Sequence, residues 1–267
     1  MFPSVNIFWF RRDLRLHDNA ALYHALKEGR PVVPVFIFDR SILDKLEDKD
    51  DRRVEFIHKA LHDLQEQLAG MGSTLEVYYG FPPEVYKKLL SKYSFEKVFT
   101  NHDYEPYAQE RDAAIGNLLS EAGASLYSFK DQVIFEKDEI LKDDGKPYTV
   151  FTPYSRRWKS VLNDFYLKSY PTEKYFSHFY KQTVKTLPSL EEMGFKKTGL
   201  PFPSKVFEKD IISHYKERRD YPAIKGTSRL SVHLRFGTIS IRELAKVAVS
   251  LNESFLNELI WRDFYHM

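Results

Sequence analysis

Five short apolar runs alternate with helical patterns over the first half of the chain, and this alternation limits the fold more than any other feature. The runs are rich in β-branched and aromatic residues, which is typical of buried parallel strands. They cover residues 5–10, 32–38, 74–79, 97–101 and 125–129. The helical patterns between them cover 19–27, 52–69, 82–93 and 107–122, with Asp18 as the expected N-cap of the first helix. The predicted fold is therefore α/β: a Rossmann-like five-stranded parallel sheet with helices on both faces.

Two turns after predicted strands are rich in polar side chains, and ligands of open parallel sheets bind beyond such strand ends. The first, 9–19, contains no glycine, so it does not fit the fingerprint of a dinucleotide site. Its three arginines and two aspartates could form a solvated ion-pair cluster, or a cluster that fixes the domain against a partner surface. The second, 101–106, could line a ligand cleft or be a plain surface loop.

Composition excludes several classes of protein. The chain has no cysteine, which excludes disulfides, thiolate zinc sites and iron–sulfur clusters, and no other metal site is predicted. The formal net charge is only +2, so contact with nucleic acid would need a local basic patch. No apolar run approaches about 18 residues, and the first residues have no basic leader pattern. We therefore expect a cytoplasmic protein without a membrane partner.

The pattern changes near residue 130. Residues 131–203 are charged and irregular with several prolines, and we interpret them as a connector after an α/β domain at 1–130. From 204 to 267 the pattern is helical, so an all-α domain follows. Its predicted helices are 206–218, 228–236, 240–251 and 254–267, and Ser240 with Glu243 forms a capping box for the third.

The last helix carries an acid, a large aromatic ring, a cation and a phenol on one stripe, because residues three and four apart share a face. These are Glu258, Trp261, Arg262 and Tyr265. The stripe could belong to a ligand site. It could equally be part of a plain core helix with an intrahelical Glu258–Arg262 pair, a spacing that favours such pairs.

A second candidate site begins at Gly226. The hydroxyls of Thr227 and Ser228, free backbone amides at a helix start and the Arg229 guanidinium could bind an anion, or Thr227 and Ser228 could be simple helix caps. Tyr215 and Arg219 precede this stretch. Together with the aromatic stripe of the last helix, the stretch suits a flat cofactor that carries phosphates and lies next to a nucleic-acid surface.

Four motifs together resemble the photolyase/cryptochrome flavoprotein family. They are Trp-Phe-Arg-Arg-Asp-Leu-Arg-Leu-His-Asp-Asn at 9–19, Phe-Thr-Pro-Tyr at 151–154, Gly-Thr-Ser-Arg-Leu-Ser at 226–231 and Asn-Glu-Leu-Ile-Trp-Arg-Asp-Phe-Tyr at 257–265. The resemblance spans nearly the whole chain in family order. It implies FAD in the helical domain and a second, antenna chromophore of the folate or deazaflavin type with the α/β domain.

The resemblance also implies roles for individual residues. FAD would be bound by Tyr215, Thr227, Ser228, Arg229, Leu230, Ser231, Phe255 and Arg262. DNA would be bound by Arg219, Glu258, Trp261, Arg262 and Tyr265, with Arg219 on the phosphates. Glu258 and Trp261 would be the catalytic residues, since they would contact a lesion flipped out of the duplex. Asn101 and Glu105 match the antenna loop of the family.

Glu258 paired with Trp261 is similar to the branch of the family that repairs cyclobutane pyrimidine dimers. The implied function is light-driven electron transfer from reduced FAD to the dimer, a carbon–carbon lyase reaction, in a protein that is monomeric at full length. Two alternatives are a cryptochrome-like blue-light photoreceptor and an inactive fragment. The helical domain of the family continues beyond the 257–265 motif, so we expect only its first part here, and weak binding of FAD by the isolated chain.

Overall fold

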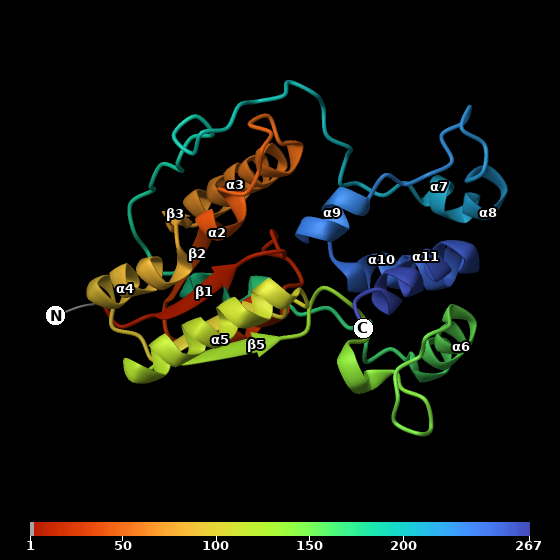
Figure 1. Ribbon diagram of the computed structural model, residues 1–267, viewed down its shortest axis with the longest axis horizontal. Helices are drawn as coiled ribbons and strands as arrows, with labels where there is room; N and C mark the ends of the chain where they lie inside the picture. The colour runs from red at the N-terminus through yellow and green to blue at the C-terminus, as the bar shows by residue number, and fades with distance from the viewer. Residues whose placement is uncertain (1–2) are drawn as a thin grey trace. The chain divides into compact units, whose positions relative to one another are not determined.

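The computed structural model describes residues 3–267 and divides the chain into two compact units (Figure 1). The α/β unit contains the chain up to Phe129 together with Tyr170–Phe202. The helical unit contains Lys130–Ser169 and Pro203–Met267. The segment predicted as a connector, 131–203, is thus shared: its first part folds with the helices and its last part folds on the sheet.

The α/β unit contains a sheet of five parallel strands, as predicted. The strands are β1 (Asn6–Phe10), β2 (Val32–Asp39), β3 (Glu76–Gly80), β4 (Lys97–Asn101) and β5 (Ser125–Phe129). Their order is β3-β2-β1-β4-β5, and every pair is parallel. The chain therefore reverses its direction across the sheet between β1 and β4, where open α/β sheets bind ligands.

Helices cover both faces of the sheet because successive side chains of a strand point to opposite sides. The helices are α1 (Ala20–Lys27), α2 (Arg40–Leu43), α3 (Arg52–Gly70), α4 (Pro82–Lys92) and α5 (Pro106–Glu121). Ile7 and Trp9 of β1 share a core with Tyr86 of α4 and Ile115 of α5. Residues of the alternate set face the other side, where Phe38 lies next to His58 of α3.

The first helix is capped by Asn19, so the prediction of Asp18 as its N-cap was wrong. The Asn19 side chain accepts a hydrogen bond from the Leu22 amide over 3.1 Å. Asp18 has a φ of 46°, in the left-handed region. Its carboxylate accepts a hydrogen bond of 2.7 Å from the Tyr170 amide instead, and so ties the segment 170–202 to the start of the sheet.

The helical unit contains six α-helices among the described residues. They are α6 (Phe151–Val161), α7 (Lys209–Ser213), α8 (Tyr215–Arg218), α9 (Ser231–Phe236), α10 (Ile241–Leu251) and α11 (Glu253–Phe264). Its core joins Phe135, Trp158, Leu244, Leu259 and Ile260. Ser240 is the N-cap of α10 and accepts from the Glu243 amide over 3.2 Å, as the capping motif predicts.

Two predicted helices of this unit differ from the structure. The helix expected over 206–218 is broken into α7 and α8, and the side-chain Nδ2 of Asn252 donates to the Ser213 carbonyl over 2.8 Å at the end of α7. The helix expected from residue 228 begins only at Ser231. The turn before it contains Arg229 with a φ of 54°, and a left-handed residue cannot lie inside a right-handed helix.

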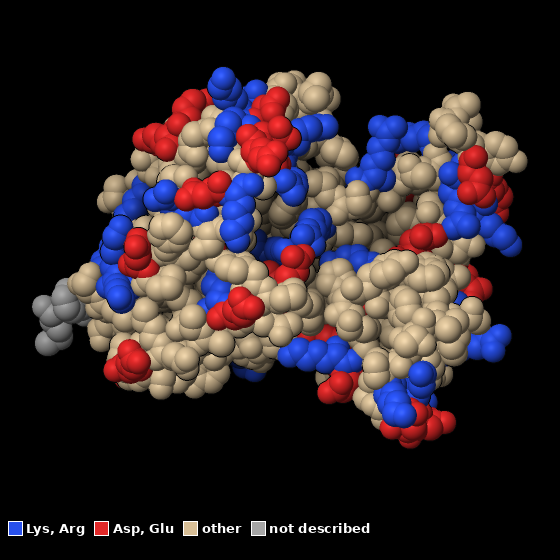
Figure 2. All heavy atoms as spheres, viewed as in Figure 1, with Lys and Arg blue, Asp and Glu red and all other residues tan. Residues whose placement is uncertain are grey.

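Charges of both signs are mixed over the surface of the α/β unit. Figure 2 shows Lys and Arg side by side with Asp and Glu over the visible face of this unit. This agrees with the small net charge of +2. Within residues 3–267, no helix combines the length and the apolar character that crossing a membrane requires.

A buried carboxylate at the start of β3 holds the sheet and the returning segment together. The Glu76 carboxylate accepts from Lys92 Nζ at 2.7 Å, Lys185 Nζ at 2.5 Å, and the hydroxyls of Tyr78 and Tyr93, each at 2.5 Å. Burial alone would raise its pKa, but the hydrogen bonds from the two lysines and two tyrosines outweigh burial and hold the pKa at about 2. Glu76 thus joins α4 and the segment 170–202 to the sheet.

We predict that Glu76→Gln lowers the free energy of unfolding of the α/β unit by about 3 kcal/mol at pH 7. Because the folded-state pKa lies below the unfolded one, this stability is present above about pH 4.5 and is lost as the pH falls toward 2. Urea unfolding, with hydrogen exchange at β3, measures the effect. Glu96→Gln, which removes an exposed pair with Arg30, should change the free energy by less than about 0.5 kcal/mol. Equal losses in the two variants would contradict the role of Glu76.

Candidate functional site

The helical unit contains a cavity of about 800 Å³, a size that suits a large organic ligand. One wall is formed by the loop before α9 and by α9 itself. The opposite wall is formed by α11, and α8 and the segment after residue 130 complete the lining. The lining residues are Gln132, Tyr215, Thr227, Ser228, Arg229, Leu230, Ser231, Leu234, Arg235, Phe255, Glu258, Leu259, Trp261, Arg262, Tyr265 and His266.

The structure brings together nearly all residues that the sequence suggested for cofactor and DNA. Those that line this one cavity are Tyr215, Thr227, Ser228, Arg229, Leu230, Ser231, Phe255, Glu258, Trp261, Arg262 and Tyr265. Arg219 does not line it, but its guanidinium forms an ion pair with Glu258. Their individual roles stay predictions; what the structure adds is that they share one site.

Five lining residues were missed by the sequence reasoning: Gln132, Leu234, Arg235, Leu259 and His266. A signal existed for four of them. Leu234 and Arg235 lie three and four positions after Ser231, Leu259 lies four after Phe255, and His266 lies four after Arg262, so each shares a face with a predicted residue. Gln132 is about a hundred residues away in the sequence, and no local pattern connects it to the site.

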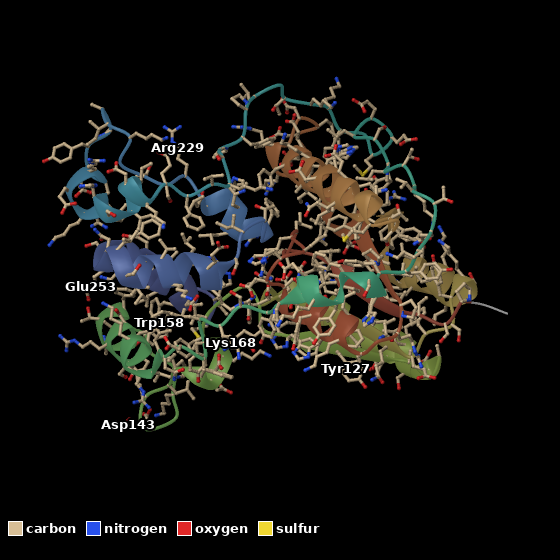
Figure 3. The ribbon with its side chains drawn as sticks, turned by 180° about the vertical axis from the view of Figure 1, so that it is seen from behind. Tyr127, Asp143, Trp158, Lys168, Arg229 and Glu253 are labelled. Atoms are coloured by element: carbon tan, nitrogen blue, oxygen red, sulfur yellow. The ribbon has the colours of Figure 1, made fainter. Side chains whose placement is uncertain are left out.

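The loop before α9 offers unused hydrogen-bond donors. Within residues 3–267, the backbone N–H groups of 227–230 donate to no carbonyl or side chain, and no carboxylate pairs with Arg229. The loop packs tightly on α8, since a Cβ added at Gly226 would lie 2.2 Å from the Arg218 carbonyl oxygen. Figure 3 shows Arg229 on this loop. Free N–H groups, hydroxyls and an unpaired guanidinium are the groups that bind phosphate.

Four aromatic side chains also line the cavity: Tyr215, Phe255, Trp261 and Tyr265. Trp261 is stacked on Phe151 with ring centres 3.7 Å apart and planes 5° apart, and its ring lies 5.5 Å from that of Tyr265. Tyr215 meets Phe255 edge-to-face at 5.2 Å. The cavity therefore joins a loop with unused N–H donors to flat apolar surfaces that can contact a ring system.

The two charged residues of the α11 stripe have separate partners, so the intrahelical Glu258–Arg262 pair is not formed. Glu258 Oε1 lies 2.6 Å from Arg219 Nη1. Arg262 donates to the Gln132 carbonyl and, over 3.2 Å, to the Leu234 carbonyl. Arg262 therefore joins α11 to α9 and to the segment after residue 130, and Glu258 contacts α8 through Arg219.

The opposite side of α11 is fixed by Asp263, which sequence reasoning did not select. Its side chain is buried, and Oδ2 accepts from the amides of Ile134 (3.1 Å) and Phe135 (3.2 Å) and from Trp158 Nε1 (3.0 Å; Figure 3 shows Trp158 on α6). Burial raises the pKa of this carboxyl to about 6, although these hydrogen bonds and Arg262 oppose the shift. The signal in the sequence was an acid among apolar helix positions.

The predicted antenna residues lie in the α/β unit, after β4. Asn101 is buried; its Nδ2 donates to Asp13 Oδ2 (2.6 Å) and Asn19 Oδ1 (2.8 Å), and its Oδ1 accepts from the Ala21 amide (3.0 Å). Glu105 lies 2.9 Å from Arg12 Nη1. In the turn 9–19, Arg11 pairs with Asp112, and Arg12 pairs with Asp103 and Glu105, inside this unit. An antenna role for Asn101 and Glu105 stays a prediction.

A parallel α/β sheet followed by a helical unit, whose cavity is lined by unused N–H donors and aromatic rings, is the arrangement that the four sequence motifs led us to expect of a photolyase/cryptochrome flavoprotein. The family model for DNA photolyase matches residues 6–175, and the chain belongs to that family.

Known relatives extend this comparison. A deoxyribodipyrimidine photo-lyase of Synechococcus sp. (PCC 6301) is 31% identical over 97% of this chain and 59% of its own length. A bacterial class III photolyase from Agrobacterium tumefaciens superposes with a TM-score of 0.81 at 25% identity, covering 100% of this chain and 59% of that structure. An archaeal photolyase from Sulfolobus tokodaii, solved with two FAD molecules, has a TM-score of 0.73 at 27% identity, over 98% of this chain and 58% of that one. The chain thus spans about three fifths of these relatives' length.

We predict that Asp263→Ala lowers the free energy of unfolding of the helical unit by about 3 kcal/mol or more, because three buried donors lose their acceptor. Asp263→Asn keeps an acceptor oxygen, so it should lower the free energy of unfolding clearly less than Asp263→Ala does. Since the folded-state pKa is raised from 3.8 to about 6, the native protein should lose stability as the pH rises through that window. Urea unfolding between pH 4 and 7 measures both effects. If the free energy of unfolding of Asp263→Asn changes with pH as it does in the native protein, Asp263 is not the source of the pH dependence.

Proposed function

We propose that this chain forms part of a light-driven DNA repair flavoprotein that acts on cyclobutane pyrimidine dimers. It would hold FAD in the cavity of the helical unit and present Glu258 and Trp261 to the lesion. The observation that carries the proposal is the single cavity of about 800 Å³, where a loop with unused N–H donors faces a wall of aromatic rings. Such a site suits a ligand that combines phosphates with a flat ring system.

The groups that line the cavity suit the phosphates and ribose of FAD as well as its remaining parts. The amides of 227–230, the hydroxyls of Thr227, Ser228 and Ser231, and the Arg229 guanidinium would bind the phosphates and ribose. Tyr215, Phe255 and Arg262 would contact the remaining parts. When bound and reduced, FAD supplies the light-driven electron transfer that opens the dimer, while the protein binds and orients both partners.

The α11 wall would receive the lesion. A dimer inside a duplex is out of reach, so it must be flipped out, and damage lowers the energy that flipping requires. Trp261 presents a ring held in place by Phe151, and stacking on such a ring contributes about 1–3 kcal/mol per base. Glu258 can accept hydrogen bonds from the base edges, Arg219 would bind DNA phosphates, and Tyr265 would lie on the DNA side.

The remaining proposals concern the α/β unit and the whole protein. We assign a second chromophore of the folate or deazaflavin type to the α/β unit, with Asn101 and Glu105 near it, and expect a cytoplasmic monomer at full length. The support for the second chromophore is the resemblance of the loop 101–106 to the antenna loop of the family. An absorbance spectrum of the full-length protein, with the bound chromophores extracted and identified, tests this assignment.

We predict that Trp261→Ala weakens binding to a duplex containing a thymine dimer about tenfold or more, while binding to the undamaged duplex changes by less than twofold. The reason is that only a flipped dimer can stack on the ring. Fluorescence anisotropy with the two labelled duplexes measures this. Phe165→Ala removes an exposed ring of the same unit and should change neither affinity. Equal losses on both duplexes would exclude the stacking role.

We predict that Arg229→Gln binds FAD about tenfold more weakly than the unchanged chain, because a charge-assisted contact to phosphate is lost. Quenching of flavin fluorescence during titration measures both affinities. Lys246→Gln, an exposed cation on α10, is the matched control. Light-dependent loss of dimers from irradiated DNA, in the presence of reduced FAD, tests the activity itself. If Arg229→Gln and Lys246→Gln bind FAD alike, Arg229 does not hold the phosphates.

A further inference from the structure

The carboxylate that lines the cavity, Glu258, already forms an ion pair with Arg219, which does not line the cavity. Among the lining residues, all within the described part of the chain, only Glu258 carries a carboxylate. Its Oε1 lies 2.6 Å from Nη1 of Arg219, whose guanidinium lies 5.6 Å from the centre of the Tyr215 ring. Asp220 lies 3.7 Å from Arg219 Nε. In the DNA-free protein, Arg219 is thus surrounded by two acids and an aromatic ring.

The Arg219–Glu258 pair can open easily. The two side chains are 40% and 41% exposed, so water competes for both groups and the pair contributes little to folding. A DNA phosphate offers Arg219 a stronger, charge-assisted partner. If Arg219 moves to a phosphate, however, Glu258 remains at the cavity as a carboxylate without its cation.

We propose that the Arg219–Glu258 pair couples phosphate binding to recognition of the lesion, so that Arg219 binds DNA fully only when a base edge replaces it at Glu258. This inference rests on the proposed function. It assigns Arg219 a part in specificity in addition to the phosphate contact.

The coupling follows from what each kind of DNA offers to Glu258. In undamaged duplex the base N–H groups are used by base pairing, so Glu258 gains no donor when Arg219 leaves. A flipped dimer exposes its N–H groups, and Glu258 can exchange Arg219 for them. Undamaged DNA that covers the cavity therefore takes water from Glu258 without supplying a donor, and a charged group left without a partner is an established way for a binding site to reject a competitor.

Four proteins test the coupling: the native chain, Glu258→Gln, Arg219→Gln and the double variant, each with damaged and undamaged duplex. We expect Glu258→Gln to bind undamaged duplex two- to fivefold more tightly, because Arg219 is released. The slope of log K against log salt should steepen by about one, since one more phosphate is neutralised. In the Arg219→Gln background, Glu258→Gln should leave binding to undamaged duplex unchanged.

Glu253→Gln is the matched control. It removes the same charge from the same helix, but its partner is Lys159 at 2.6 Å. If Glu253→Gln tightens binding as much as Glu258→Gln, the gain comes from net charge and the coupling is refuted. If the native chain prefers damaged DNA but Glu258→Gln does not bind undamaged duplex more tightly, the coupling is refuted and the proposed function remains intact. Failure of the native chain to bind either duplex contradicts both.

Discussion

The position of α11 depends on one buried carboxylate. Asp263 receives three hydrogen bonds from two other segments, the amides of Ile134 and Phe135 and the indole of Trp158 on α6. A buried carboxylate is costly unless such donors surround it, so the helix has one favoured orientation, in which all three bonds form. With that side of α11 fixed, Glu258 and Trp261 must face the cavity, because they lie on another face of the same helix.

The cavity wall opposite α11 is held in a different way. Gly226 allows the loop to pass against the Arg218 carbonyl, and Arg229 adopts a left-handed φ of 54°. Such conformations are unfavourable for residues with side chains and persist where the surrounding structure enforces them. The result is a loop whose N–H groups are withheld from any helix and remain available. The two walls are thus complementary: one supplies donors for anions and the other supplies rings.

Several predictions held because they rest on local periodicity, and several did not because a distant segment intervened. The continuous apolar runs predicted as strands and the long helix over 52–69 appear in the structure nearly as predicted. The intrahelical Glu258–Arg262 pair, which the sequence left open as an alternative, is not formed, since Glu258 pairs with Arg219 and Arg262 donates to two carbonyl groups. The helix predicted from residue 228 begins at Ser231, because the loop packs on α8. Gln132 and Asp263 escaped notice because their partners lie far away in sequence.

The sequence by itself determined the α/β class, the number of strands and their places along the chain, and most residues of the candidate site, because hydrophobic patterns and motif spacing are local properties of a chain. Tertiary structure decided which segment each charged residue joins: Glu76 with Lys185 of the segment 170–202, Asp263 with residues 134–135 and α6, and Glu258 with Arg219. An ion pair or buried hydrogen bond depends on distance in space, and folding brings together residues that no spacing along the chain connects.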